Sequence, residues 1–259
     1  MASLKEVKGR IASVNNTRKI TSAMKMVASA KLHKAQAAIE SMLPYERRLH
    51  HILTDFMSNC TEVTSPFIVK REVKKVAVVV FASNTSLCGG FNAKVADAVR
   101  KLGFRIEGDF QHMADKPSYQ EAADLAADLM KRFLHGDVDK VELLYNHFKS
   151  TASQILTRET YLPIDLNNEK KEEERTIDYI LEPSAEELMQ EMLPKVLRMK
   201  MFTVLLDSNA AEHAARTMAM QIATDNANEL LQELTVMYNK SRQQSITNEL
   251  LDIVGGSMA

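Results

Sequence analysis

The turn at residues 83–92 (SNTSLCGGFN) is where the sequence could most readily support chemistry, because it follows an apolar run at residues 73–82 and contains Gly89 and Gly90. A strand, a glycine-containing turn and a helix in this order can hold a phosphate on backbone N–H groups. The turn has neither G-x-x-x-x-G-K-S/T nor G-x-G-x-x-G, however. We therefore expect a tight turn that leads into a helix, with no nucleotide and no other cofactor.

Other groups suited to catalysis or metal binding are scattered along the sequence. No histidine has the spacing of a zinc ligand set, and the adjacent His50 and His51 would point to different helix faces. No G-x-S-x-G nucleophile elbow occurs, and only its place beside a turn suggests reactivity for Cys88. We interpret Cys60 and Cys88 as structural thiols of a reducing compartment. The sequence therefore predicts no catalytic residue, no metal site and no enzyme.

Charge is distributed unevenly along the 259 residues. The net charge is -1, but residues 1–50 hold ten Lys and Arg against three Glu. A basic helix can follow a nucleic-acid backbone, yet this one lacks interleaved aromatic residues and belongs to a nearly neutral chain. An acidic protein partner fits this excess better than nucleic acid does, and a solvated helix face is the simpler alternative.

The N-terminal sequence MASLKEVKGRIASV has polar residues where a secretory signal needs an unbroken apolar core. No part of the sequence approaches the roughly 18 consecutive apolar residues of a membrane-spanning helix. We therefore expect any membrane association to come through partners.

Both ends of the chain have the pattern of long amphipathic helices. Residues 2–43 contain no proline and one glycine, and residues 209–254 contain neither. Apolar residues recur mostly every three, four or seven positions, which is the period of one helix face. The first stripe is Leu4, Val7, Ile11, Val14, Met24, Val27, Ala35, Ala38 and Met42, and the second is Ala211, Ala215, Met218, Ile222, Leu230, Leu234, Met237, Ile246, Leu250 and Ile253.

Two such helices can bury their stripes against each other as a long antiparallel coiled coil. The polar run at residues 15–19 interrupts the first stripe, and buried polar groups need partners. In the C-terminal segment we expect a kink at Pro194, a break near Asp207 and Ser208, and an end at Gly255 and Gly256. The alternative is that each helix belongs to a separate bundle or to an interface between subunits.

Between the helices the sequence predicts a small α/β domain. Residues 73–82 are β-branched and uniformly apolar, as in a strand buried on both faces, and residues 141–146 and 155–162 are further expected strands. Helices are expected at residues 93–102 and 119–134. The order strand, helix, helix, strand favours a sheet that contains a parallel pair.

The segment before the C-terminal helix marks the predicted boundary between that helix and the α/β domain. Residues 165–175 are almost wholly charged or polar and indicate a solvated loop, and residues 176–181 are a candidate strand. Ser184 and Glu187 form a capping-box pattern at the start of a helix. The predicted domains are residues 1–58, 73–182 and 184–259, and the first is expected to pair with the last.

The sequence resembles the ATP synthase gamma-subunit family over nearly its whole length. Residues 7–36 (VKGRIASVNNTRKITSAMKMVASAKLHKAQ) resemble the family's N-terminal signature, and residues 207–256 resemble its C-terminal signature. The intervening motifs SLCGGFN, DKPSY, VELLYNHF and YILEPSAEEL occur in the family's order.

The resemblance implies the paired helices already expected, with a small Rossmann-like α/β domain inserted between them. It implies a non-catalytic central rotor shaft that couples transmembrane proton flow to ATP synthesis or hydrolysis in the beta subunits. The implied partners are the alpha and beta subunits of the hexamer, the epsilon subunit and the ring of c subunits. The implied location is the cytoplasmic face of a bacterial inner membrane, as a peripheral protein.

The resemblance also implies which residues contact partners. Arg242 and Gln243 match positions that hydrogen-bond the beta-subunit catch loop, where a fork of guanidinium donors suits a carboxylate. Met24 and Lys25 match a turn near the beta-subunit lever. The apolar bearing is implied at Ile246, Leu250, Ile253 and Val254. Each of these residues has ordinary helix surface or seam as its alternative.

The sequence departs from the family pattern at two places. Between Leu102 and Phe110 it has only GFRIEGD, where the family has a longer strand, turn and helix. The family turn S-D-R/K-G-L-C-G is replaced by SNTSLCGG, which changes the charge there. The regulatory dithiol insert of the chloroplast branch is absent, which argues against thiol control of rotation.

Two other function classes fit the same pattern of elements. A coiled-coil adaptor with an α/β head would be stable alone, whereas a shaft exposes a bearing surface that expects a surrounding collar. A nucleotide-binding enzyme built on the α/β segment would bind nucleotide saturably, and the missing phosphate loop argues against it.

Overall fold

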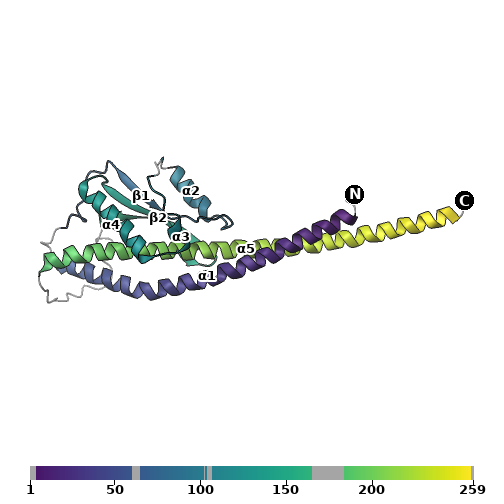
Figure 1. The fold of residues 1–259 in the computed structure, drawn as a ribbon, viewed down its shortest axis with the longest axis horizontal. Helices are drawn as coiled ribbons and strands as arrows, with labels where there is room; N and C mark the ends of the chain where they lie inside the picture. The colour runs from purple at the N-terminus through teal and green to yellow at the C-terminus, as the bar shows by residue number, and fades with distance from the viewer. Residues whose placement is uncertain (1–3, 60–64, 102, 104–106, 165–183, 258–259) are drawn as a thin grey trace. The chain divides into compact units, whose positions relative to one another are not determined.

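The computed structural model describes residues 4–59, 65–101, 103, 107–164 and 184–257. Cys60, the charged run at residues 165–175 and the expected strand at residues 176–181 lie outside this range. The elements (Figure 1) are α1 (Leu4–Asn59), β1 (Val76–Val80), α2 (Phe91–Arg100), α3 (His112–Asp115), α4 (Tyr119–His135), β2 (Lys140–Ser150), β3 (Ser153–Leu162) and α5 (Ala185–Ser257).

The chain forms two compact units, and both long helices contribute to each. The first unit consists of residues 1–29 and 216–259, and the second consists of residues 30–215. The first unit therefore contains helical segments of α1 and α5 alone among its described residues, whereas the second contains the sheet and the short helices.

In the first unit α1 and α5 pair through an antiparallel heptad seam. The α1 residues at 4, 7, 11, 14, 18, 21, 25 and 28 are buried or half-buried, and their spacing alternates between three and four. The α5 residues at 217, 220, 224, 227, 231, 234 and 238 follow the same alternation. This repeat is that of a left-handed coiled coil. The predicted pairing of the terminal helices is confirmed.

Only some residues of the two predicted apolar stripes lie in the seam between α1 and α5. Leu4, Val7, Ile11 and Val14 lie on the seam, but Val27 is 59% exposed. On α5, Leu234 is buried as expected, whereas other members of the predicted stripe are exposed, namely Met218, Ile222, Leu230 and Met237. The seam instead uses smaller and more polar residues such as Thr224 and Ala227. For these four exposed residues, the apolar pattern of the sequence had selected the outward face of α5.

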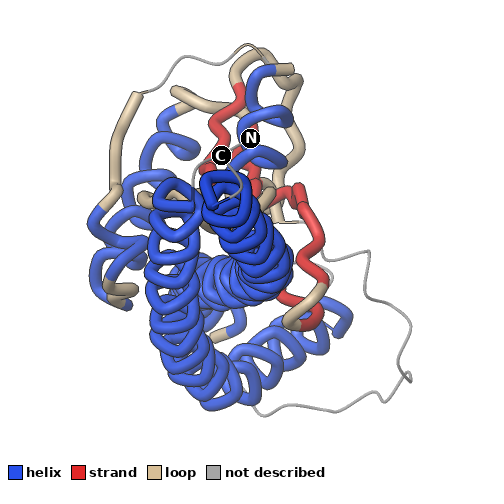
Figure 2. Tube along the Cα trace, turned by 90° about the vertical axis from the view of Figure 1, so that its right-hand side faces the viewer, coloured by secondary structure: helices blue, strands red, loops and turns tan. Residues whose placement is uncertain are grey.

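In the second unit three strands form a mixed sheet in the order β1-β2-β3, drawn in red in Figure 2. β1 runs parallel to β2, and β2 runs antiparallel to β3. A two-residue turn at Thr151 and Ala152 joins β2 to β3, as in a tight hairpin. The strands expected around residues 73–82, 141–146 and 155–162 and the parallel pair are confirmed, and β2 extends beyond its expected end to Ser150. The expectation that the first strand is buried on both faces is wrong, because β1 spans only Val76–Val80 at the edge of the sheet and both of these valines are exposed.

The connection from β1 to β2 contains α2, α3 and α4. Helix α2 begins at Phe91, two residues before its expected start, and buries Phe91 and Val95. Helix α4 closely matches its expected range and ends at His135. Gly136 caps it with a φ of 78°, a left-handed conformation suited to glycine. The N–H of Asp137 donates to the carbonyl of Arg132 at 2.9 Å, which closes the helix end.

The main core of the second unit lies between β2, α4 and the N-terminal part of α5. Val141 and Leu143 of β2, Phe133 of α4 and Leu193 of α5 are all fully buried in this cluster. Leu53 of α1 joins them and is likewise fully buried. Burying a large aliphatic or aromatic side chain stabilises a fold by about 1.5–3 kcal/mol, so these contacts dominate the cohesion of the unit.

The expected break near Asp207 and Ser208 is wrong, because α5 is one continuous helix, whereas the kink expected at Pro194 stays a prediction. Helix α5 begins at the expected cap, where the Glu187 N–H donates to Ser184 Oγ at 3.2 Å, and continues through Pro194. Asp207 and Ser208 are helical, and α5 passes Gly255 and Gly256 to end at Ser257. Packing offsets the backbone bond lost at proline, since Leu193 and Leu197 beside it are buried.

Candidate partner-binding surface

Three polar residue pairs cross the seam of the first unit. Thr224 Oγ1 lies 2.9 Å from Thr21 Oγ1, and Lys25 Nζ donates to Gln221 Oε1 at 2.8 Å. Arg18 donates to Asn228 Oδ1 at 3.4 Å. The residue number rises along α1 as it falls along α5, so the pairs fix both direction and register. The expectation that polar seam residues need partners is met at Arg18.

The structure places Met24 and Lys25 on the paired part of α1. Met24 is half-buried, and Lys25 is half-buried with its ammonium group held by Gln221. Lys25 is thus a seam residue whose charge lies at the edge of the helix pair. A partner that binds here would meet both the Lys25 ammonium group and the Gln221 amide.

Arg242 and Gln243 lie near the other end of the same unit. Extending the antiparallel register from Thr21 and Thr224 places Leu4, the first described residue of α1, opposite Ser241, the residue before Arg242. Both side chains are exposed, and neither makes a hydrogen bond or ion pair within the described part of the chain. The guanidinium and the amide are therefore available to a partner. Along α5 they lie roughly 30 Å from Gln221, so the two predicted contact sets form separate sites.

The predicted bearing residues lie beyond this point, on the last three turns of α5. We call residues 246–254 the apolar tip. Its large apolar side chains are Ile246 (45% exposed), Leu250 (58%), Leu251 (63%), Ile253 (68%) and Val254 (51%). A continuous run of exposed aliphatic side chains marks an interaction surface in a soluble protein. Leu251 belongs to this surface, although the sequence did not single it out.

The first unit has further exposed apolar side chains whose exposure the sequence interpretation missed. On α1 they are Ile20, Met26 and Val27, which are 59–63% exposed, and on α5 they include Val236 and Met237. The sequence signal that could have identified these exposed residues is the heptad spacing of the α5 seam, which includes Thr224, Ala227 and Leu234. That heptad assigns the seam, and the remaining apolar residues must then face outward.

The glycine turn before α2 forms a closed structure of its own. The Ser83 N–H donates to Asn92 Oδ1 at 2.9 Å, and Asn92 Nδ2 donates back to the Ser83 carbonyl at 3.0 Å. Gly89 has a φ of 60°, and Cys88 is buried beside it with Ala211 and Phe91. Side-chain amide and backbone groups thus hold the turn shut. Among the described residues, no group of three or more His, Cys, Asp or Glu is arranged to hold a metal ion.

No described helix meets the requirements of a membrane span, since none combines the length and the apolar character that crossing a bilayer demands.

Comparison with known proteins gives one family. The family model described as ATP synthase matches residues 3–259. The ATP synthase gamma chain of Phocaeicola vulgatus is 76% identical, with all of both chains covered, and that of Bacteroides thetaiotaomicron is 58% identical at the same coverage. The gamma chain of Flavobacterium johnsoniae is 41% identical over 100% of this chain and 99% of that one.

Solved structures show the same fold at lower identity. A chain of the Euglena gracilis mitochondrial ATP synthase, from the OSCP/F1/c-ring structure, has a TM-score of 0.65 and 17% identity, covering 98% of this chain and 93% of that chain. A chain of the Tetrahymena thermophila central stalk and c-ring has a TM-score of 0.55 and 20% identity, covering 79% and 99%.

The alignment with the Phocaeicola vulgatus chain also bears on length. It spans 289 positions, whereas this chain has 259 residues, so it includes positions to which this chain contributes no residue. A shortening relative to the family was expected between Leu102 and Phe110.

Proposed function

Since this chain belongs to the ATP synthase gamma-chain family, we propose that its helix pair contacts the catalytic beta subunits through Arg242 and Gln243, with Met24 and Lys25 as a separate contact. The chain is the non-catalytic central shaft of an F-type ATP synthase. Catalysis lies in the beta subunits, and the shaft couples ion flow across the membrane to their conformational changes.

The observation that carries the proposed contacts is the exposure of the C-terminal end of α5. Arg242 and Gln243 present unpaired hydrogen-bond donors just where the described part of α1 begins. A guanidinium can donate two parallel bonds to a carboxylate, which suits a contact that must form and break as the shaft turns. The apolar tip lies directly beyond them.

We assign the bearing to the apolar tip, with Ile246, Leu250, Ile253 and Val254 as its contact residues. Aliphatic side chains that are 45–68% exposed can slide against an apolar collar without breaking directional bonds. Polar contacts would resist rotation at each step, because each broken bond costs about 0.5–1.5 kcal/mol. In this proposal the apolar tip holds the shaft in its collar, and the hydrogen-bond donors of Arg242 and Gln243, which precede the tip on α5, transmit torque.

The remaining partners follow from membership of the family. We place the alpha and beta subunits around the helix pair, and the epsilon subunit and the ring of c subunits at the α/β part of the chain. The complex is membrane-associated, and the chain reaches the membrane through these partners. We further propose the cytoplasmic face of a bacterial inner membrane, which the identity to bacterial gamma chains supports.

The function is tested by reconstitution. ATP hydrolysis by purified alpha and beta subunits of the same organism is measured with and without this chain, and the mixtures are separated by size-exclusion chromatography. A shaft raises the hydrolysis rate and co-elutes with a hexameric ring. Separate elution with unchanged hydrolysis would favour the adaptor, and saturable nucleotide binding by the chain alone would favour the enzyme.

A further inference from the structure

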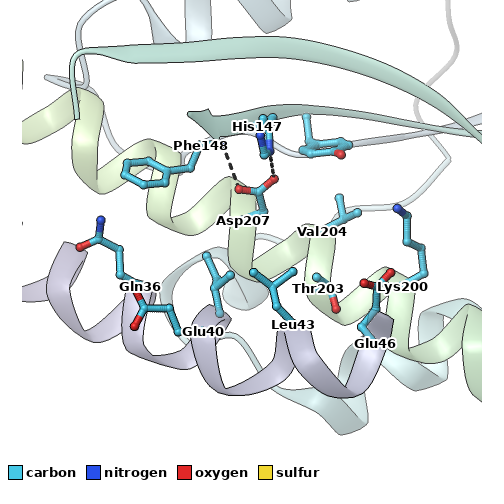
Figure 3. A pocket seen from close by; sticks show the side chains of 12 residues that line it. Gln36, Glu40, Leu43, Glu46, His147, Phe148, Lys200, Thr203, Val204 and Asp207 are labelled. Carbon is cyan, nitrogen blue, oxygen red and sulfur yellow. Dashed lines mark hydrogen bonds and ion pairs between the residues drawn. The ribbon is translucent and has the colours of Figure 1, made fainter. Parts of the chain in front are cut away.

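A groove in the second unit lies between α1, β2 and α5 (Figure 3). Its volume is about 360 Å³, within the range of roughly 300–1,000 Å³ that small-molecule sites occupy. Ile39 and Leu43 of α1, Phe148 of β2 and Val204 of α5 give it an apolar lining. The rotor function assigns no role to this groove.

Two of the charged groups in the groove already have partners. Asp207 accepts the Phe148 N–H at 2.9 Å and lies 2.7 Å from His147 Nδ1. Lys200 Nζ lies 3.5 Å from Glu159 Oε1. The Lys200 ammonium group is therefore already held by a carboxylate of the same unit.

Two carboxylates of α1 have no such partner. Glu40 is exposed and Glu46 is half-buried, and neither forms an ion pair or hydrogen bond within the described part of the chain. Both line the groove, with Leu43 between them along the helix (Figure 3). They are six positions apart, which is about 9 Å along the helix axis.

The negative charge of Glu46 reaches the buried wall of the groove at Tyr145. Burial raises the pKa of the Tyr145 hydroxyl, and the nearby carboxylates of Glu159, Asp207 and Glu46 raise this pKa further. Tyr145 lines the groove and is only 6% exposed. Carboxylates from α1, β3 and α5 thus all lie near enough to the Tyr145 hydroxyl to raise its pKa.

We propose that this groove binds a linear aliphatic polyamine, with one ammonium group at Glu40, another at Glu46, and the connecting methylene chain against Leu43 and Ile39. An apolar ligand would desolvate the two free carboxylates without compensation. An anion would meet charge of the same sign. A monoamine would neutralise only one carboxylate, whereas a polyamine matches both charges and the apolar surface between them.

The test is isothermal titration calorimetry of the purified full chain with spermidine, repeated with butylamine as a single-ammonium probe. The variants are Glu40→Gln and Glu46→Gln. Glu191→Gln is the matched control, because Glu191 is an exposed α5 carboxylate paired with Lys195 outside the groove. Circular dichroism spectra establish that each variant keeps its helices.

Spermidine is expected to bind at one saturable site and more tightly than butylamine. Glu46→Gln should weaken binding about fivefold or more, and Glu40→Gln about two- to fivefold, because the more exposed carboxylate is better screened by solvent. Glu191→Gln should leave the affinity unchanged. The proposal is overturned by the absence of saturable heat, by equal affinity for butylamine, or by equal weakening in all three variants, which would indicate diffuse charge attraction.

Discussion

The Glu142 carboxylate is the centre of a buried ion network on β2. It accepts from Lys140 Nζ at 2.7 Å and from Arg158 Nε at 2.6 Å, and the residue is 5% exposed. Burial alone would raise the pKa of Glu142, but hydrogen bonds from Lys140 and Arg158 outweigh it and hold the pKa below its ordinary value of 4.5. The network therefore stabilises the folded chain above that pH and loses its effect as the pH falls through the lowered pKa.

Glu142→Gln is expected to lower the free energy of unfolding by about 2 kcal/mol at pH 7, because two cations lose their shared carboxylate. Urea denaturation followed by circular dichroism measures the change at pH 7 and again near pH 3. The difference from the unmodified chain should shrink at the lower pH. Glu72→Gln is the control, since Glu72 is 82% exposed beside Lys74 and should change stability by less than about 0.5 kcal/mol. A pH-independent difference would contradict the charge network.

Arg242 and Gln243 allow a second prediction at the residue scale. Replacing both with Ala should lower ATP hydrolysis by the assembled alpha, beta and gamma complex about tenfold, because a charge-assisted bond contributes about 1.5–3 kcal/mol. Assembly and the melting temperature of the isolated chain should stay unchanged, since neither side chain has a partner within the described chain.

The matched control for this pair is Lys240→Ala with Gln244→Ala, which removes one charge and one amide from exposed positions of the same helix segment. Its turnover should stay near that of the unmodified complex. Unchanged turnover in the Arg242 and Gln243 variant would refute the contact assignment. Equal loss in both variants would show that the overall charge of the segment matters and not these two residues.

Among the elements, the α1 and α5 segments of the first unit are held by small and polar seam residues as well as aliphatic ones. Ala28 is 2% exposed and Ala227 is 7% exposed, so parts of the seam have room for little more than a methyl group. Thr21 and Thr224 join across it. Close approach and crossed hydrogen bonds give a stiff pair with one register, which a torque-transmitting shaft requires.

Ala28→Leu is expected to destabilise the helix pair by about 1–3 kcal/mol, because a larger side chain cannot fit the seam without shifting it. Ala23→Leu is the control, since Ala23 is exposed on the same helix. Thermal unfolding monitored at 222 nm, a helix-sensitive wavelength, compares the two variants with the unmodified chain. Similar melting of both variants would mean that the seam is looser than the burial of Ala28 indicates.

For the molecule as a whole, folding and coupling depend on different residues. The core of the second unit and the seam of the first unit bury the side chains that stabilise the chain. The apolar tip buries little, because its large side chains are 45–68% exposed. The bearing role that we propose for it would therefore be fulfilled only in the assembled complex, where a collar covers this surface.

Replacing Ile246, Leu250, Ile253 and Val254 together with Ser should leave the urea midpoint of the isolated chain nearly unchanged. The same variant should reduce coupled ATP synthesis in the complete enzyme, because the apolar contact with the collar is lost. The two readouts separate folding from function. A large drop in the urea midpoint would show that the tip stabilises the chain itself, and normal ATP synthesis would rule out the bearing role.

The sequence by itself determined the class of elements and their order. Long segments with periodic apolar residues and no proline predicted the terminal helices, a β-branched run predicted β1, and residues 141–146 and 155–162 were the expected strands that became β2 and β3. These features are local, since spacing along the chain sets which residues share a helix face or strand face. The resemblance to the family is local too, because the motifs near both ends of the chain carry it in their residue order alone.

Only the tertiary structure decided which face of each helix packs and whether the C-terminal helix is interrupted. Met218 and Ile222 are more apolar than Thr224, yet the seam uses Thr224, because Thr21 lies opposite and supplies its hydrogen bond. Helix α5 continues through Pro194 because buried leucines on either side hold it. The groove beside Glu40 and Glu46 likewise exists only where α1, β2 and α5 meet. Each outcome depends on residues distant in the sequence, and local patterns contain no information about which of them become neighbours.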